Sequence, residues 1–136
     1  MATTPLQNLT AQQVSHPIIT TAMRDHSELG PGLLESTYQV CLQHEHKKAG
    51  LRSESQVGLP AFYNGVHLDL GYRIDLLVED LVVVELKSID AIAPIHQAQL
   101  LSYLKLSGKS LGLLINFNEV HLKDRIRRFV NGTKWQ

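Results

Sequence analysis

Three charged residues near the middle of the chain stand among apolar neighbours. Glu85 and Lys87 interrupt the run Leu81-Val-Val-Val-Glu-Leu-Lys87, and Asp75 lies in Tyr72-Arg-Ile-Asp-Leu-Leu-Val78. Placing a carboxylate or an ammonium in such a strand is costly unless the group pairs or binds something. Two interpretations of Glu85 and Lys87 therefore stay open: a simple ion pair at the end of a strand, or part of a site.

Asp75 favours the second interpretation. The two runs are typical of strands joined by a tight turn at Glu79-Asp80, so a hairpin brings Asp75 beside Glu85. Adjacent carboxylates repel unless a cation lies between them, and oxygen ligands of this kind suit Mg²⁺ or Mn²⁺. A two-residue loop would place Asp75 opposite Val84, whereas an odd-numbered loop such as Glu79-Asp80-Leu81, or a β-bulge, would place it opposite Glu85. The metal site requires the latter.

Two predicted helices carry further polar side chains in apolar settings. Glu35 and Tyr38 are three residues apart and share a helix face, as do Gln99 and Tyr103, which are four apart. Taken one at a time, each is more typical of a solvated or capping residue than of a ligand.

Four short motifs occur in a specific order and spacing. They are Gly32-Leu-Leu-Glu-Ser-Thr-Tyr38, Gly71-Tyr-Arg-Ile-Asp75, Glu85-Leu-Lys87 and Gln99-Leu-Leu-Ser-Tyr103. Together they resemble the GxxExxY proteins, which belong to the PD-(D/E)xK nuclease superfamily, close to its RecB-like and lambda-exonuclease-like branches. The resemblance runs from about Ile18 to Val130. One departure is that Ile74 precedes Asp75 where the superfamily motif has proline, at a position that varies.

The resemblance implies an α/β, restriction-endonuclease-like fold, with a central mixed β-sheet flanked by helices. It also implies a Mg²⁺-dependent (or Mn²⁺-dependent) nuclease that hydrolyses phosphodiester bonds of nucleic acid, DNA above all. Asp75 and Glu85 would be the main metal ligands, and the Leu86 carbonyl would be a third. Glu35 would hold the metal directly or through water.

The resemblance gives the remaining motif residues roles in catalysis. Lys87 would orient or deprotonate the attacking water and steady charge on the phosphate, while Gln99 and Tyr103 would position the substrate backbone or the lysine. General chemistry agrees, because phosphodiester hydrolysis needs a metal to polarise the phosphoryl oxygen and activate water. A cation such as Lys87 can stabilise the developing negative charge.

Composition sets limits on the function. The 136 residues suffice for one domain, and the net charge of zero argues against a non-specific nucleic-acid coat protein, which would be basic. The single Cys41 excludes an internal disulfide and a four-cysteine cluster, and so argues against the iron–sulfur nucleases of the superfamily. No apolar run approaches the roughly 18 residues of a membrane span, and the start lacks signal-peptide features. We therefore expect a cytoplasmic protein.

Basic residues gather near the end of the chain, in residues 123–136. We expect Arg125, Arg127 and Arg128 to bind nucleic acid, and a solvated face of a helix or strand is the alternative. His44 and His46 are two apart on a helix and point to different faces, so we read both as surface residues rather than zinc ligands.

Periodicity and turn residues predict the elements. Residues 1–13 are polar and expected to be flexible, and residues 14–136 form the domain. A first helix, with Pro17 in its first turn, ends at Gly30. The other predicted elements are a helix over 33–48, strands over 51–63, 66–70, 72–78, 81–88 and 110–117, and a helix from Pro94 to Gly108. The tail from His121 to Val130 fits helix and strand, and we favour helix.

Two other functions remain open. One is a catalytically silent nucleic-acid-binding or assembly module that keeps the nuclease fold, and the other is a metal-dependent hydrolase of a different phosphate ester. Exposed apolar positions on the first helix are compatible with a homodimer, which the sequence does not establish.

Overall fold

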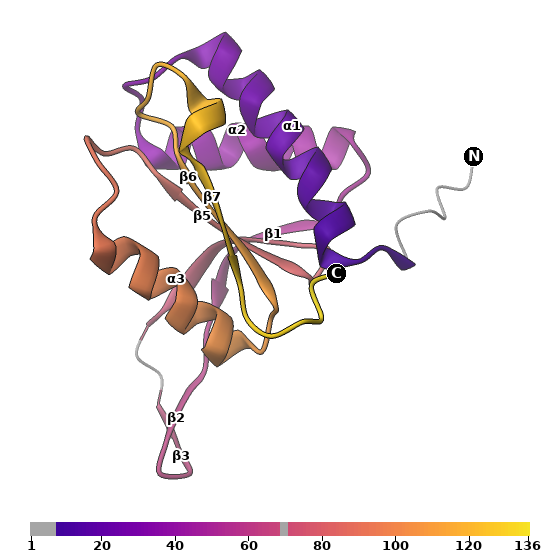
Figure 1. Ribbon diagram of the computed structural model, residues 1–136, viewed down its shortest axis with the longest axis vertical. Helices are drawn as coiled ribbons and strands as arrows, with labels where there is room; N and C mark the ends of the chain where they lie inside the picture. Colours follow the sequence, from indigo (N-terminus) through magenta and orange to yellow (C-terminus); the bar gives the residue numbers. More distant parts are fainter. Residues whose placement is uncertain (1–7, 69–70) are drawn as a thin grey trace.

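A five-stranded sheet forms the centre of the molecule and separates two helical layers (Figure 1). The computed structural model describes residues 8–68 and 71–136, apart from the side chain at position 124. Helices α1 (Ala11–Leu29) and α2 (Glu35–Lys48) pack on one face of the sheet, and α3 (Pro94–Ser107) packs on the other. We call these the first face and the second face.

The strand order of the sheet is β1-β4-β5-β6-β7. The strands are β1 (Ser53–Gly58), β4 (Arg73–Val78), β5 (Val82–Lys87), β6 (Leu111–Asn116) and β7 (Ile126–Val130). Strands β5 and β6 are parallel because α3 connects them across the second face, and the other neighbours are antiparallel. This arrangement confirms the predicted mixed sheet flanked by helices.

Strands β2 (Ala61–Tyr63) and β3 (Val66–Leu68) form a separate hairpin. Tyr63 pairs with Val66 across a two-residue turn, Asn64-Gly65, whose φ angles are 51° and 77°. Positive φ at both positions is the type I′ geometry that Asn-Gly favours, so these two residues account for the tight reversal between β2 and β3. The predicted strand over 51–63 is broken at Leu59-Pro60, and residues 69 and 70 of the predicted strand over 66–70 lie outside the described residues.

The first helix starts earlier than expected, at Ala11. Thr10 and Gln13 form a capping box, and the Gln12 N–H donates to the Trp135 carbonyl at 2.8 Å. Pro17 consequently lies inside the helix and not in its first turn. Of the predicted flexible segment, residues 1–7 lie outside the described residues, and Ala11 to Gln13 belong to α1. None of the helices in the described part of the chain is long and apolar enough to cross a membrane.

The prediction of a helix for the tail is wrong. Residues 122–125 form one 3₁₀ turn, and the chain then continues as β7, antiparallel to β6. Ile126 packs on the first face and Phe129 on the second, so the apolar residues do not form a single helical stripe. Pairing with β7 satisfies the backbone of β6, which would otherwise be an exposed edge.

The prediction for His46 is also wrong, whereas His44 is exposed as expected. His46 is fully buried between α2 and β1, with Nδ1 3.0 Å from Ser53 Oγ, and its Nε2 has no hydrogen-bond partner among the residues that the structure describes. Burial lowers the pKa of His46 to about 4, so the ring is neutral at pH 7.

Candidate active site

The loop between β4 and β5 has the odd length that the metal site requires. The strands pair Val78 with Val82, Leu77 with Val83 and Leu76 with Val84, so the loop comprises residues 79–81. Glu79 and Asp80 have φ angles of 53° and 55°, which makes the reversal tight. Continuing this register places Asp75 opposite Glu85.

Asp75 and Glu85 contact each other directly at the end of the two strands. The Asp75 N–H donates to Glu85 Oε1 at 3.2 Å, and the Leu86 N–H donates to Asp75 Oδ2 at 2.8 Å. Glu85 is only 5% exposed. Burial, together with the neighbouring Asp75 charge, raises the pKa of Glu85 to about 9, although Lys87 acts in the opposite direction. Glu85 is therefore protonated at pH 7 when no cation lies beside it.

Lys87 shares the second face with Glu85, because the two are alternate residues of β5. Within the described residues, no ion pair shorter than 4.0 Å joins Lys87 to a carboxylate. The simple ion-pair interpretation of Glu85 and Lys87 is therefore not what the structure contains.

Glu35, the first residue of α2, lies within electrostatic range of the same cluster. It is half-buried, and burial raises the pKa of its carboxyl. Lys87 lowers this pKa and Asp75 raises it, so the charges of both residues reach Glu35.

The turn before α2 positions Glu35. Gly32 has a φ of +96°, and the Tyr38 hydroxyl donates to the Gly30 carbonyl and accepts from the Leu33 N–H at 3.2 Å. Ser88 Oγ donates to the Leu33 carbonyl, which ties the turn to the residue after Lys87. Within Gly32-x-x-Glu35-x-x-Tyr38, the glycine and the tyrosine thus build the scaffold that presents the glutamate.

Gln99 and Tyr103 of α3 form a hydrogen-bonded pair, with the Gln99 amide donating to Tyr103 Oη at 3.0 Å. Burial raises the pKa of Tyr103, and the charges of Glu85 and Asp75 raise it further, so the hydroxyl lies near the carboxylates. The ring of Tyr72, just before β4, lies 6.1 Å from that of Tyr103. The structure therefore brings both α3 residues to the predicted cluster.

Sequence reasoning missed two amide side chains. Gln56 of β1 has a φ of +51°, and its amide donates to Gln39 of α2 at 2.8 Å and to Asp75 Oδ1 at 3.4 Å. Asn116 pairs with Lys87 across β5 and β6, and its side chain bonds the backbone N–H and carbonyl of Ile89 at 3.1 and 2.9 Å. Asn116 could have been found as a polar residue in an otherwise apolar strand. For Gln56 the sequence contains no such signal.

The fit of a divalent cation can be judged from the donor set. The described residues contain no group of three or more His, Cys, Asp or Glu side chains arranged to hold a metal ion. Asp75 and Glu85 are therefore a pair, with Glu35 farther out. Mg²⁺ is usually bound through one or two carboxylates, several waters and substrate phosphates, so a carboxylate pair fits it better than a closed protein cage would.

The three arginines near the C-terminus do not form one patch. Arg125 pairs with Glu119 at 3.3 Å, and Arg128 points to the first face, where it lies 3.3 Å from Ser15 of α1. Arg127 differs, because it pairs with Leu114, which pairs with Glu85. Arg127 therefore lies in the same row of the sheet as Glu85, two strands away and on the same face, at roughly 10 Å.

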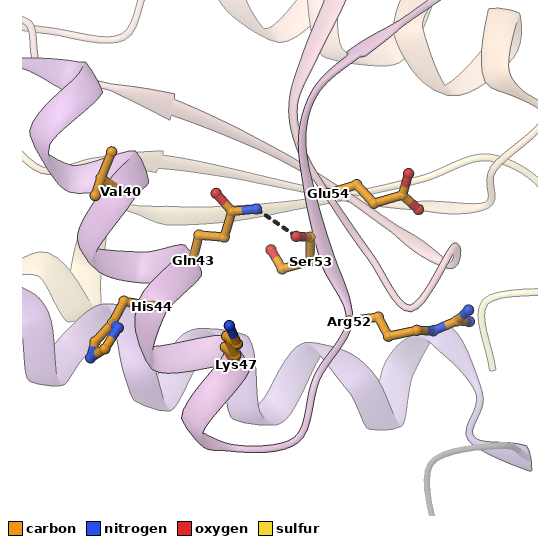
Figure 2. Close-up of a pocket in the computed structure, with 7 residues that line it drawn as sticks. All are labelled: Val40, Gln43, His44, Lys47, Arg52, Ser53 and Glu54. Atoms are coloured by element: carbon orange, nitrogen blue, oxygen red, sulfur yellow. Dashed lines mark hydrogen bonds between the residues drawn. The ribbon is translucent and has the colours of Figure 1, made fainter.

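A hollow of 660 Å³ lies between α2 and β1 (Figure 2). Its lining includes Lys47, Arg52 and Glu54, and the Gln43 amide, also in the lining, donates to the Ser53 carbonyl at 2.6 Å. It contains none of the predicted site residues. The chemistry is therefore expected at the end of β4 and β5 and not in this groove.

A comparison with protein-family models matches residues 12–129 to the model described as the PD-(D/E)XK nuclease superfamily. No curated protein and no solved structure matches the chain significantly. The match covers most of the chain and includes every predicted site residue, but it does not separate the GxxExxY proteins or either branch from the rest, so those assignments stay predictions. The chain belongs to the PD-(D/E)XK nuclease superfamily.

Proposed function

We propose that the protein is a metal-dependent nuclease that hydrolyses phosphodiester bonds of nucleic acid, DNA in particular. The observation that carries the proposal is the contact between Asp75 and Glu85, with Lys87 on the same face of the sheet. Two adjacent carboxyl groups of which one is almost fully buried, with no protein cation paired to either among the described residues, are what a divalent cation would stabilise.

Asp75, Glu85 and the Leu86 carbonyl would hold Mg²⁺ or Mn²⁺, with Glu35 bound through water. When bound, the cation supplies Lewis-acid polarisation of the phosphoryl oxygen and a more acidic water. Lys87 orients that water and stabilises the charge that develops on the phosphate. The hydrogen bond from Leu86 to Asp75 Oδ2 and that from Gln56 to Oδ1 orient the aspartate beforehand.

Substrate contacts come from residues around this centre. The Gln99 amide has a second N–H, and Tyr103 lies beside the carboxylates, so this pair can bond a phosphate oxygen of the strand. Arg127, in the same row of the sheet as Glu85, is suited to a neighbouring phosphate. Arg125 and Arg128 have protein partners and contribute less.

The test is degradation of labelled DNA with Mg²⁺ or Mn²⁺ by the wild type, Asp75→Asn and Lys87→Ala. Asp80→Asn and Lys47→Ala are matched controls, because both side chains are exposed and lie outside the site. We expect cleavage by the wild type and both controls, and none by the two site variants. Equal cleavage by all five proteins, or none by any, would count against the proposal.

A second candidate is a binding module without catalysis. It is favoured by the small number of side-chain ligands, because the described residues contain no third His, Cys, Asp or Glu side chain that completes a metal-binding group with Asp75 and Glu85. Such a module would bind nucleic acid with an affinity that falls as salt rises and is insensitive to Asp75→Asn, whereas Arg127→Ala would weaken it. Binding without cleavage in either metal would favour this candidate.

A further inference from the structure

The β2–β3 hairpin extends away from the body of the molecule (Figure 1). Phe62, Tyr63 and Val66 on it are 66%, 68% and 57% exposed. Two large aromatic rings side by side in the sequence, both facing water on a projecting element, are the kind of surface that usually marks a binding site.

The pairing of the two strands shows how the rings are presented. Phe62 pairs with His67 on one face of the ribbon, with ring centroids 5.1 Å apart, and Tyr63 pairs with Val66 on the other. Ala61 at the base is buried, so the ribbon is anchored to the domain. An occupant would therefore find a flat ring on each side of a narrow ribbon.

The hairpin is continuous with the candidate active site. The Leu59 N–H, just before β2, donates to the Tyr72 carbonyl at 2.9 Å, and the ring of Tyr72 lies 6.1 Å from that of Tyr103. The β1–β4 register places Asp75 level with Gln56, and Tyr63 follows seven residues later. At about 3.3 Å per residue along the chain and about 5 Å between neighbouring strands, Tyr63 is at most roughly 28 Å from Asp75, a span that a few nucleotides can cover.

The chemistry of the hairpin favours nucleic-acid bases over an acidic or a strongly apolar partner. Residues 59–68 contain no Asp or Glu, although Asp69 follows them directly in the sequence, and the exposed Arg73 lies at the base. Asn64 in the turn and His67 opposite Phe62 add polar groups to the hairpin. Aromatic rings bind bases by stacking, whatever the base, but only where the bases are not already stacked in a duplex.

We propose that the β2–β3 hairpin is a stacking platform for unpaired bases, and hence that the substrate contains a single-stranded segment next to the bond held at Asp75 and Glu85. This inference rests on the proposed function, because it assumes that a nucleic-acid strand reaches the carboxylates. Phe62 and Tyr63 are the residues that stack on the bases.

The test is binding of a labelled single-stranded oligonucleotide and of a matched duplex in EDTA, where no metal-dependent cleavage occurs, measured by fluorescence anisotropy. We expect Phe62→Ala/Tyr63→Ala to weaken single-strand binding by at least about tenfold and to leave duplex binding unchanged. The matched control is Val120→Ala, which removes an equally exposed apolar side chain on another loop. Circular dichroism and thermal unfolding confirm that each variant is folded.

Two conservative variants separate stacking from general apolar contact. Phe62→Leu keeps an apolar side chain and is expected to weaken binding as the alanine does, whereas Phe62→Trp is expected to retain it. The new indole should also lose fluorescence on binding, measured against the wild type, whose own Trp135 is present in both proteins.

Full single-strand binding by Phe62→Leu, or equal loss of single-strand and duplex binding in the double alanine variant, would overturn the proposal. So would sedimentation showing that the wild type is a dimer that the double variant dissociates, since a second copy would then occupy the hairpin. The two proposals fail separately. If the hairpin variants weaken single-strand binding but the wild type cleaves in no metal, the stacking proposal is kept and the nuclease proposal is rejected. If the wild type cleaves and the hairpin variants cleave equally well, the nuclease proposal is kept and the stacking proposal is rejected.

Discussion

The two faces of β5 differ although they belong to one six-residue strand. Val82, Val84 and Leu86 on the first face are fully buried against the cluster that includes α1 and α2. On the second face Val83 is apolar, but the next two positions are Glu85 and Lys87, where α3 contributes Gln99 and Tyr103. Alternate residues of one strand therefore serve stability and, on our proposal, chemistry, and the two functions can be separated by mutation.

The largest effect is expected on the second face. Lys87→Ala should lower cleavage by at least about 100-fold, because charge on the phosphate loses its stabilising cation. The free energy of unfolding should change by less than about 1 kcal/mol, since Lys87 is half-buried and forms no ion pair within the described structure. Initial cleavage rates and urea unfolding measure the two. If the variant lost enough stability to account for its loss of activity, the two faces of β5 would not have separate functions.

The reverse result is expected on the first face. Leu113 pairs with Val84 and is fully buried, so Leu113→Ala should lower the free energy of unfolding by about 2–5 kcal/mol. Cleavage per folded molecule should stay within a few-fold of the wild type, because the side chain points away from the carboxylates. Urea unfolding measures the first quantity, and rates at low temperature, normalised to the folded fraction, measure the second. Inactivity of the fully folded variant would contradict this.

Glu85 is expected to cost stability at neutral and alkaline pH without a cation. The pKa of Glu85 in the folded protein, about 9, lies above its ordinary value of 4.5. The contribution of Glu85 to the free energy of unfolding is therefore fully present below pH 4.5 and is lost as the pH rises towards 9. Glu85→Gln, which resembles the protonated form, should therefore gain about 1–3 kcal/mol relative to the wild type between pH 5 and pH 8 in EDTA. Thermal unfolding across this range checks the sign, and a constant difference would refute it.

The smallest effect is expected from His46, the buried imidazole on the first-face side. Its folded pKa of about 4 is below the ordinary 6.5, so the unfolded chain binds the extra proton and stability falls as the pH drops from 6.5 towards 4. Between pH 7 and pH 5 the wild type should lose about 1–2 kcal/mol that His46→Gln does not lose. Comparing the slopes of stability against pH avoids any dependence on the absolute stability of the variant. Parallel slopes would mean that His46 does not titrate on unfolding.

Much of the candidate site could be predicted because it depends on local features. The placement of Glu85 and Lys87 on one face follows from their spacing in a strand. The sequence left the length of the loop at Glu79-Asp80 open, and the structure has the three-residue loop that the metal site requires. Turn residues such as Asn64-Gly65 likewise determine their own geometry. Periodicity was enough to place the second and third helices and most strands near their observed positions.

Features that depend on distant parts of the chain could not be predicted. The tail becomes β7 because β6 offers it a strand edge, and His46 is buried because β1 packs over α2. The separation of Arg127 from Arg128 follows from the same strand, whose alternate residues point to opposite faces. Gln56 reaches Asp75 only through a left-handed backbone in β1, which residue type alone does not indicate.

The central claim is that Asp75 and Glu85 hold a divalent cation, and anomalous scattering from a crystal soaked in Mn²⁺ tests it most directly. We predict a peak between the two carboxylates that disappears in Asp75→Asn. Peaks only at other acidic positions, such as Asp25 and Glu45 between α1 and α2, or no peak at a Mn²⁺ concentration that supports cleavage, would contradict the account.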